Sequence, residues 1–235
     1  SGRAIADILK DIISPYISPA VSNVQTNADG SSKGTAQLEI GQSIGSAIAL
    51  TFSISNAENL AASNPIEVDG GSGFLVSNPY PNAPISLTPN GVLAPVSPTV
   101  YTIRVRAEDS EGNFSGYSNA TVRFDTRFIW GASQLADLTT NQHALDLIPS
   151  GGQGVKQGYQ ADYEFTTAGY GYILIPSVLS PTNVTFTDVT NPQTPSTVEM
   201  VNVGTLQVNN GVGTYNYEKF RTPFNNLEGS IIRAS

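Results

Sequence analysis

One stretch decides the fold: Thr99-Val100-Tyr101-Thr102-Ile103-Arg104-Val105-Arg106-Ala107-Glu108-Asp109. Its apolar residues, from Tyr101 to Ala107, alternate with polar ones, which is the period of a strand with one buried face. A polar turn follows over residues 110–113, and residues 115–124 return as a second strand. The sequence therefore predicts an antiparallel β-hairpin at this point.

The hairpin belongs to a series of short strands between residues 20 and 125. Turn clusters separate the strands, and six prolines between residues 78 and 98 predict that this segment lies at a sheet edge. The hairpin resembles the F–G hairpin of immunoglobulin-like and fibronectin type III domains. That resemblance implies a β-sandwich over residues 20–125 and no function of its own. The other strands predicted here cover residues 21–24, 47–54, 65–68 and 74–76.

A second β domain is predicted over residues 126–235. The sequence changes character at Asp125-Thr126-Arg127, and a new apolar segment begins at Phe128. Ser133 is placed to cap a short helix over residues 134–138, and Gly151-Gly152-Gln153-Gly154 is predicted to be a loop. The predicted fold class is all-β, with two β-sandwich-like domains preceded by a short N-terminal helix. The strands predicted in the second domain cover residues 162–165, 171–176, 183–187, 197–203, 206–208, 213–224 and 230–233.

Residues 1–19 form a separate segment, an N-terminal helix with a proline-rich connector. Ile5, Ile8, Leu9 and Ile12 recur at the spacing of one helical face. The prolines that follow lack an amide donor and end the helix. A helix of about three turns is marginal alone in water, so its apolar stripe needs a partner surface. We therefore predict that these four residues form an assembly interface.

The composition argues against several classes of function. Only 13% of the residues are charged, whereas 39% are hydrophobic and 9% aromatic, a profile typical of all-β domains. The net charge is −8, and without a basic cluster neither nucleic acid nor an anionic membrane is an expected partner. No apolar run approaches the roughly 20 residues that span a bilayer. Cysteine is absent, which excludes thiol catalysis, and no cofactor is expected.

Three groups of residues were candidates for chemistry. His143 with Asp146 could act as an oriented base, although a surface or capping histidine gives the same pattern. Asp162 and Glu164 share one strand face about 7 Å apart, a spacing that suits glycoside hydrolysis but also an ordinary solvated face. The turn at Asp109 concentrates oxygen ligands suited to calcium, while turns recruit the same residue types for backbone reasons. We predict no catalytic, cofactor or metal site.

Three stretches together resemble tail-fibre, baseplate or related virion proteins of tailed bacteriophages. The predicted helix with Pro15-Tyr16-Ile17-Ser18-Pro19 resembles a segment that precedes immunoglobulin-like phage modules. Phe128-Ile129-Trp130-Gly131-Ala132-Ser133 resembles the "YWG-S" start of a terminal β domain. Residues 170–176 and 214–222 resemble later strands of that domain, although the "Y-VYRS" pattern common at the last site is absent. The resemblance implies a non-enzymatic virion component that acts in assembly and host attachment.

This resemblance also implies the location and the partners of the chain. The location is the virion, and the partners are other virion proteins, copies of the chain itself in a homo-oligomer such as a trimer, and a host-surface glycan. Two alternatives stay open. A bacterial cell-surface or extracellular carbohydrate-binding or adhesion module would bind glycan as a monomer, and a glycan hydrolase would depend on Asp162 or Glu164. Six tyrosines could stack on sugars or instead fill the core: Tyr159, Tyr163, Tyr170, Tyr172, Tyr215 and Tyr217.

Overall fold

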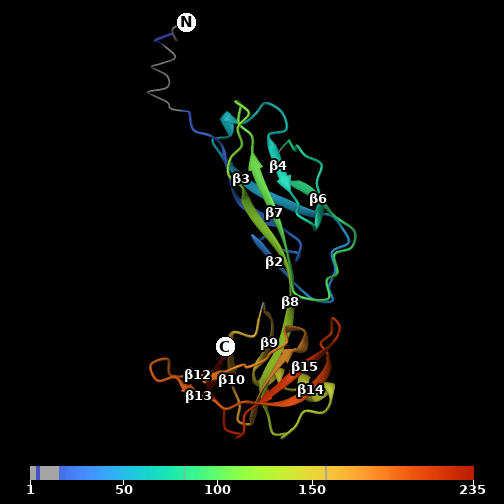
Figure 1. The fold of residues 1–235 in the computed structure, drawn as a ribbon, viewed down its shortest axis with the longest axis vertical. Coiled ribbons are helices and arrows are strands. Elements are labelled where there is room, and N and C mark those ends of the chain that lie inside the picture. Colours follow the sequence, from blue (N-terminus) through green and yellow to red (C-terminus); the bar gives the residue numbers. More distant parts are fainter. Residues whose placement is uncertain (1–3, 6–15, 82, 157) are drawn as a thin grey trace. The chain divides into compact units, whose positions relative to one another are not determined.

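The computed structural model describes residues 4–5, 16–81, 83–156 and 158–235, which are mostly antiparallel β-structure (Figure 1). The chain divides into two compact units, and each combines segments that are separate in the sequence. Unit 1 comprises residues 1–36, 43–93 and 100–123. Unit 2 comprises residues 37–42, 94–99 and 124–235.

Unit 1 contains two antiparallel sheets. One has the strand order β1-β3-β6-β5, and the other joins β4, β7 and the first part of β8. The predicted one-sided pattern of the hairpin is confirmed, because Ile103, Val105 and Ala107 are buried while Arg104 between them is exposed. The elements are β1 (Ala20–Thr26), β2 (Thr35–Glu39), β3 (Ile48–Ser55), η1 (Ala57–Asn59), β4 (Ile66–Asp69), β5 (Phe74–Leu75), β6 (Ile85–Pro89), β7 (Thr99–Ala107) and β8 (Ser118–Ser133). Of these, β2, β7 and β8 also contain residues of unit 2.

Unit 2 contains two further groups of strands and a central helical segment. The strands β14-β15-β11-β8 are neighbours in one sheet, with β9 paired to β8, and β10-β16-β12-β13 form the other. The helical segment is α2 (Asn141–Leu145) followed by the 3-10 turn η2 (Ile148–Ser150), and η3 (Ser177–Leu179) follows β11. The strands are β9 (Gly152–Lys156), β10 (Ala161–Phe165), β11 (Tyr170–Pro176), β12 (Phe186–Asp188), β13 (Ser196–Thr197), β14 (Val201–Asn209), β15 (Thr214–Arg221) and β16 (Ser230–Ala234).

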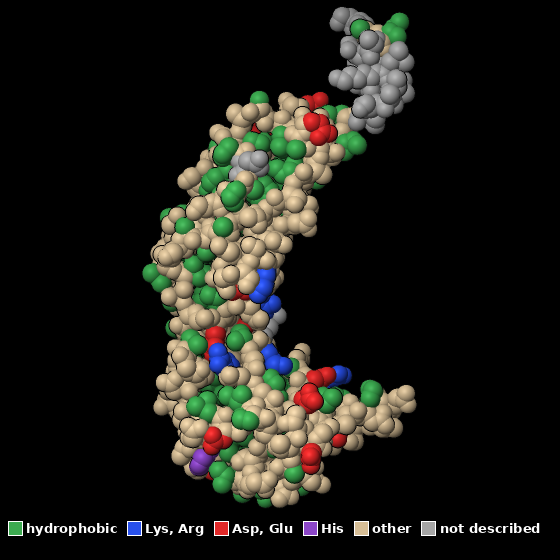
Figure 2. Space-filling view, turned by 180° about the vertical axis from the view of Figure 1, so that it is seen from behind, with side chains coloured by type: hydrophobic (Ala, Val, Ile, Leu, Met, Phe, Trp, Pro, Cys, Tyr) green, Lys and Arg blue, Asp and Glu red, His purple; other side chains and the backbone are tan. Residues whose placement is uncertain are grey.

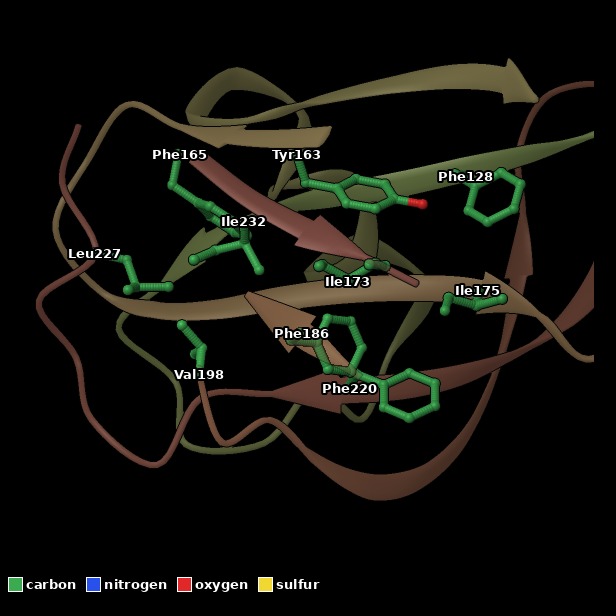
Figure 3. Close-up of a cluster of buried hydrophobic side chains, with 11 residues drawn as sticks. Phe128, Tyr163, Phe165, Ile173, Ile175, Phe186, Val198, Phe220, Leu227 and Ile232 are labelled. Carbon is green, nitrogen blue, oxygen red and sulfur yellow. The ribbon is translucent and has the colours of Figure 1, made fainter. Parts of the chain in front are cut away.

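An aromatic cluster joins the two sheets of unit 2 (Figure 3). Phe128 and Ile173 come from the sheet that contains β8 and β11, and Tyr163, Phe186 and Ile232 come from the other sheet. All five side chains are buried. Each large apolar side chain removed from water contributes about 1.5–3 kcal/mol, so this cluster is the main reason why the two sheets stay together.

A second cluster covers the opposite face of the β11 sheet. Tyr172 and Leu174 alternate along β11 with the residues of the first cluster and therefore point to the other side. There they pack with Tyr217 of β15 and with Ala144 and Leu147 of the helical segment. Because β11 is covered on both faces, its sequence is a continuous apolar run rather than an alternating one.

The position of the helix differs from the prediction. Within the described residues the α-helix is central, at α2. The predicted N-terminal helix lies outside the described residues, except for Ala4 and Ile5. The chain therefore combines a mostly β fold with a short helix that covers a sheet in the middle of the sequence.

The helix predicted over residues 134–138 is wrong. The strand β8 continues to Ser133, whose hydroxyl accepts a hydrogen bond from the Leu135 N–H at 3.1 Å and so caps a turn instead. The helix begins after Thr140, whose side chain accepts from the His143 N–H at 3.2 Å. Serine and threonine cap turns and helices by the same bond, so a capping residue alone does not distinguish the two.

Two strands replace predicted irregular segments. β6 is not at a sheet edge, because it pairs with β3 on one side and β5 on the other. Its buried residues Ile85 and Leu87 alternate, while Pro84 and Pro89 stand at its ends, where proline interferes least with pairing. β9 occupies the predicted glycine loop and pairs with β8.

Candidate functional site

A pocket with a volume of about 230 Å³ lies entirely in unit 2. The end of β2, the middle of β8, the turn η3 and the β14–β15 hairpin form its walls. Its polar side is made by Glu39, Arg127 and Asn210, and its apolar side includes Pro176 and Val178. Segments far apart in the sequence thus meet at one place.

Glu39 reaches this pocket because the chain turns sharply after β2. The Ile40 N–H donates to the carbonyl of Asp125 at 2.9 Å, which ties the segment to β8. Gly41 has a φ of 101°, and a Cβ at this position would lie 2.2 Å from the Tyr215 hydroxyl oxygen. Only glycine fits both the backbone conformation and the space, so Gly41 allows the turn to pack against β15.

A buried ionic network forms the floor of the pocket. Glu39 is only 3% exposed, and its Oε2 accepts from Nη2 of Arg127 at 2.5 Å and from Nε at 2.9 Å. Its Oε1 accepts from the Asn210 side-chain amide at 2.5 Å. Arg127 also donates to Gln153 at 2.9 Å and to the Asn210 carbonyl at 3.3 Å. The carboxylate and the guanidinium compensate each other, so the floor carries no net charge.

Asn210 connects this network to the hairpin above it. Its side-chain oxygen accepts from the N–H groups of Val212 and Gly213, both at 3.1 Å, and so shapes the β14–β15 turn. Its amide group contacts the Tyr217 hydroxyl at 3.4 Å. One side chain therefore couples the conformation of the hairpin to the buried ion pair.

The two tyrosines of the pocket are protonated at neutral pH. The Tyr215 hydroxyl donates to the carbonyl of Ile40 at 2.5 Å, and burial, followed by the charge of Glu39, raises its pKa. Burial raises the pKa of Tyr217 to about 12. Neither phenol is a base at neutral pH, and their hydroxyls serve as hydrogen-bonding groups.

The candidate pair of His143 with Asp146 is not formed. The Nδ1 atom of His143 accepts from the Thr139 N–H at 3.3 Å, and Asp146 accepts instead from the Gln142 side chain at 2.7 Å. Both contacts are local bonds at the ends of α2. The histidine therefore stabilises the turn that precedes the helix.

Asp162 and Glu164 lie on one exposed face of β10, as the sequence predicts. Both carboxylate oxygens of Asp162 accept from the Arg233 guanidinium, at 2.7 and 2.9 Å, across the β10–β16 pair. This hydrogen bond and the charge of Arg233 hold the pKa of Asp162 below its ordinary value, so the group favours the ionised form. That environment is opposite to the raised pKa of a general acid.

Asp109 is buried and caps its own turn. Its Oδ1 accepts from the N–H groups of Glu111 at 2.9 Å and Asn113 at 2.8 Å, and the hydrogen bond from Asn113 is the main reason why its pKa is lowered. Within the described residues no group of three or more His, Cys, Asp or Glu side chains is placed to hold a metal ion. The lowered pKa of Asp109 follows from the backbone geometry of the turn.

Of the four predicted assembly residues, the structure describes only Ile5. Ile5 is 76% exposed, and Ile8, Leu9 and Ile12 lie outside the described residues. The helices of the described residues include none long and apolar enough to cross a membrane. On the face in Figure 2, charged side chains are few, and uncharged side chains and backbone cover most of the surface.

The pocket itself was not predicted from the sequence. Glu39 and Arg127 are 88 positions apart, and Asn210 is 171 positions from Glu39. The only local signal is the charged Glu39 between the apolar residues Leu38 and Ile40, which is unusual next to a buried strand position. That signal marks Glu39 as unusual but does not identify its partners.

Comparison with known proteins gives little similarity. No family model and no curated protein matches the sequence. A solved structure of the Streptomyces avermitilis alpha-L-rhamnosidase, complexed with L-rhamnose, aligns with 92% of this chain at 11% identity and a TM-score of 0.32. The aligned part is 23% of that enzyme's chain. Similarity at this level carries no conclusion about fold or function.

Proposed function

We propose that the chain is a non-enzymatic structural component of a bacteriophage virion, of the tail-fibre, baseplate or head-appendage type, built from two β-sandwich domains and an N-terminal assembly helix. The observation that carries the proposal is the packing role of Trp130 and Gly131. These residues belong to the stretch that resembles the start of a terminal phage β domain. Both serve packing, which is what a structural module requires of them.

Trp130 lies between two segments of unit 2. Its ring packs edge-on against Tyr163 with centroids 5.4 Å apart, and its Nε1 donates to the carbonyl of Glu164 at 3.1 Å. A Cβ at Gly152 would lie 2.7 Å from this ring, so glycine on β9 makes room for it. The Lys156 ammonium lies 5.2 Å from the ring centroid. These contacts link β8, β9 and β10 and support a structural role for the tryptophan.

Gly131 has a similar packing role. A Cβ at this position would lie 2.1 Å from the Leu147 carbonyl oxygen, and the backbone φ is 156°. The absence of a side chain lets the turn after α2 approach β8, where the Ser150 hydroxyl accepts from the Ala132 N–H at 2.8 Å. The motif thus builds the layer that covers the sheet.

The charged groups of unit 2 also support a structural role. Asp162 pairs with Arg233, Asp137 with Lys219 and Glu39 with Arg127. Each pair connects elements far apart in the sequence. Carboxylates used in this way stabilise a fold and are not poised for acid or base chemistry.

The mass of the purified chain in solution tests this proposal, by light scattering coupled to size exclusion. We expect a trimer or a larger closed ring, because virion components assemble with cyclic symmetry and the predicted helix offers an apolar stripe. A monomer across the accessible concentration range contradicts assembly through this chain alone. That outcome favours the alternative, a bacterial extracellular carbohydrate-binding or adhesion module.

A matched pair of variants tests the helix. Leu9→Asp places a charge in the predicted stripe, and Ala6→Asp places the same charge off the stripe at the helical period. We expect Leu9→Asp to reduce the solution mass to that of one chain and Ala6→Asp to leave it unchanged, with the same far-ultraviolet dichroism in both. Equal masses for the two variants would contradict the predicted interface.

A further inference from the structure

We propose that the pocket of unit 2 binds one neutral sugar ring, such as a single pyranose residue of a glycan. The inference goes beyond the proposed function, which assigns no ligand to this pocket. It rests on four properties of the pocket: its size, its charge, the division of its walls and the way they are fixed.

The size fits one ring. The volume of about 230 Å³ is equivalent to roughly eight waters at their share of liquid volume. Pockets for drug-sized ligands measure about 300–1,000 Å³, so this pocket is too small for a long or branched ligand. A single ring can enter, and the rest of a glycan would remain in solvent.

The charge favours a neutral ligand. Glu39 and Arg127 face the pocket as a compensated pair, with both oxygens of the carboxylate already accepting hydrogen bonds. An anionic ligand would lie near the Glu39 carboxylate, and a cationic one near the Arg127 guanidinium. Either would disturb a buried pair whose disruption is costly. A ligand with hydroxyls and no charge avoids that cost.

The walls are divided into an apolar side and a polar side. Val178 is 48% exposed and Val96 86% exposed, and both line the pocket beside Pro176 and the Tyr215 ring. On the polar side stands Asn216, which is exposed and whose side-chain amide has no hydrogen-bond partner among the described residues. A pyranose presents C–H groups on its face and hydroxyls around its edge. The pocket offers matching surfaces for both.

Hydrogen bonds within unit 2 hold part of the wall in place. The Tyr215 hydroxyl is bonded to the carbonyl of Ile40, and Asn210 holds the β14–β15 turn through two backbone bonds. A rigid site loses little conformational entropy on binding, which allows a small ligand to bind measurably.

The test is a nuclear magnetic resonance titration of the full chain with methyl pyranosides. The probes are the neutral methyl β-D-glucopyranoside, methyl β-D-galactopyranoside and methyl α-D-mannopyranoside, with D-glucuronate and D-glucosamine as charged rings of the same size. We expect at least one neutral probe to shift the amide signals of residues 214–217 with a millimolar dissociation constant. The charged rings should bind about fivefold more weakly or not at all.

Two pairs of variants locate the site. Asn216→Ala removes the free amide, and Asn225→Ala removes an equally exposed amide of unit 2 outside the pocket. Val178→Asp places a charge on the apolar rim, and Val201→Asp does so on an exposed valine elsewhere in unit 2. We expect each pocket variant to weaken binding about fivefold. Asn216→Ala loses about one hydrogen bond, and Val178→Asp puts a charge against the apolar face of the ring. Each control should leave binding unchanged.

Three results would overturn the inference. The first is the absence of shifts with every neutral probe at tens of millimolar. The second is equal binding by the pocket variants and their controls. The third is tighter binding of a charged ring than of a neutral one. None of them bears on the solution mass, so the sugar site and the assembly function can fail separately.

Discussion

The two units bury different kinds of side chain. Unit 1 fills its interior mainly with aliphatic residues such as Leu50, Leu87 and Ile103, although Phe74 and Asp109 are also buried. Its Arg106–Glu67 pair lies in a partly exposed position. Unit 2 buries tyrosines and phenylalanines together with the charged Glu39 and Lys219. The same antiparallel β-architecture is therefore stabilised in two ways. Unit 1 mainly buries aliphatic side chains that alternate along its strands, and unit 2 relies on aromatic packing and buried ion pairs.

This difference follows from how each unit is assembled from the chain. In unit 1 the strands of a sheet are defined by one-sided alternation, so an apolar stripe is sufficient. Unit 2 must recruit residues 37–42 from a distant part of the sequence. Buried polar partners allow only one register for such a segment, because any other leaves a charge unpaired. We infer that the Glu39–Arg127–Asn210 network fixes where this segment docks.

The largest expected effect comes from breaking the buried pair of unit 2. Arg127→Met leaves the Glu39 carboxylate buried with Asn210 as its remaining partner. We expect the free energy of unfolding of unit 2 to fall by about 3–5 kcal/mol. The fluorescence of Trp130, the only tryptophan in the chain, reports the urea midpoint of this unit.

Two controls sharpen this prediction. Arg104→Met removes an exposed pair of unit 1, in which Arg104 lies 3.7 Å from Asp69, and should change stability by less than about 1 kcal/mol. The double variant Glu39→Gln with Arg127→Met should recover part of the loss, because no charge is then left unpaired. If Arg104→Met and Arg127→Met lowered the free energy of unfolding equally, the burial of the ion pair in unit 2 would not distinguish the two units.

The second effect concerns the backbone of unit 2. Gly131→Ala forces a Cβ to within 2.1 Å of the Leu147 carbonyl oxygen, so β8 or the turn after α2 must shift. We expect a loss of about 2–3 kcal/mol, measured by the same fluorescence titration. Gly158→Ala is the matched control, because no described heavy atom lies within 4 Å of its added Cβ. A small loss at Gly131 would mean that the helical segment is not packed tightly on the sheet.

The sequence was sufficient for elements that depend on local periodicity. The alternation from Tyr101 to Ala107 defines β7, and the continuous apolar run of β11 marks a strand covered on both faces. The sequence was insufficient where the structure of a segment depends on the residues that pack against it in the folded chain. β9 contains two glycines that look like a loop until the Trp130 ring is placed against Gly152. The pocket was missed for the same reason, since its residues meet only in the folded chain.

The third effect concerns the ion pair between the buried lysine of unit 2, Lys219, and Asp137. The side chain of Lys219 is 5% exposed, and its ammonium donates to Asp137 at 2.7 Å and to the Leu138 carbonyl at 2.8 Å. Lys219→Met leaves that carbonyl without this donor and should cost about 1–2 kcal/mol at neutral pH. The Trp130 urea midpoint measures this loss.

The sign of the pH effect follows from Asp137. The hydrogen bond from Lys219 holds the pKa of Asp137 below its ordinary value of 3.8. Its contribution to stability is therefore complete above about pH 5 and is lost as the pH falls through 3.8 and then through the lower pKa of the folded state. Because the Asp137 side chain is 55% exposed, this contribution is less than about 1 kcal/mol. Wild type should lose more stability than Lys219→Met between pH 5 and pH 2, and the opposite order would contradict the pair.

The smallest effect tests the surface of unit 1. The Arg106 guanidinium lies between the rings of Phe114 and Tyr117, 4.1 and 4.7 Å from their centroids, and donates to both Glu67 oxygens at 2.8 and 2.9 Å. Arg106→Lys keeps the charge but loses the planar stacking and the paired geometry. We expect a loss of about 0.5–1 kcal/mol, measured by amide hydrogen exchange along β7. A loss as large as that of Arg127→Met would mean that unit 1 also depends on a fixed ionic contact, and the contrast between the units would not hold.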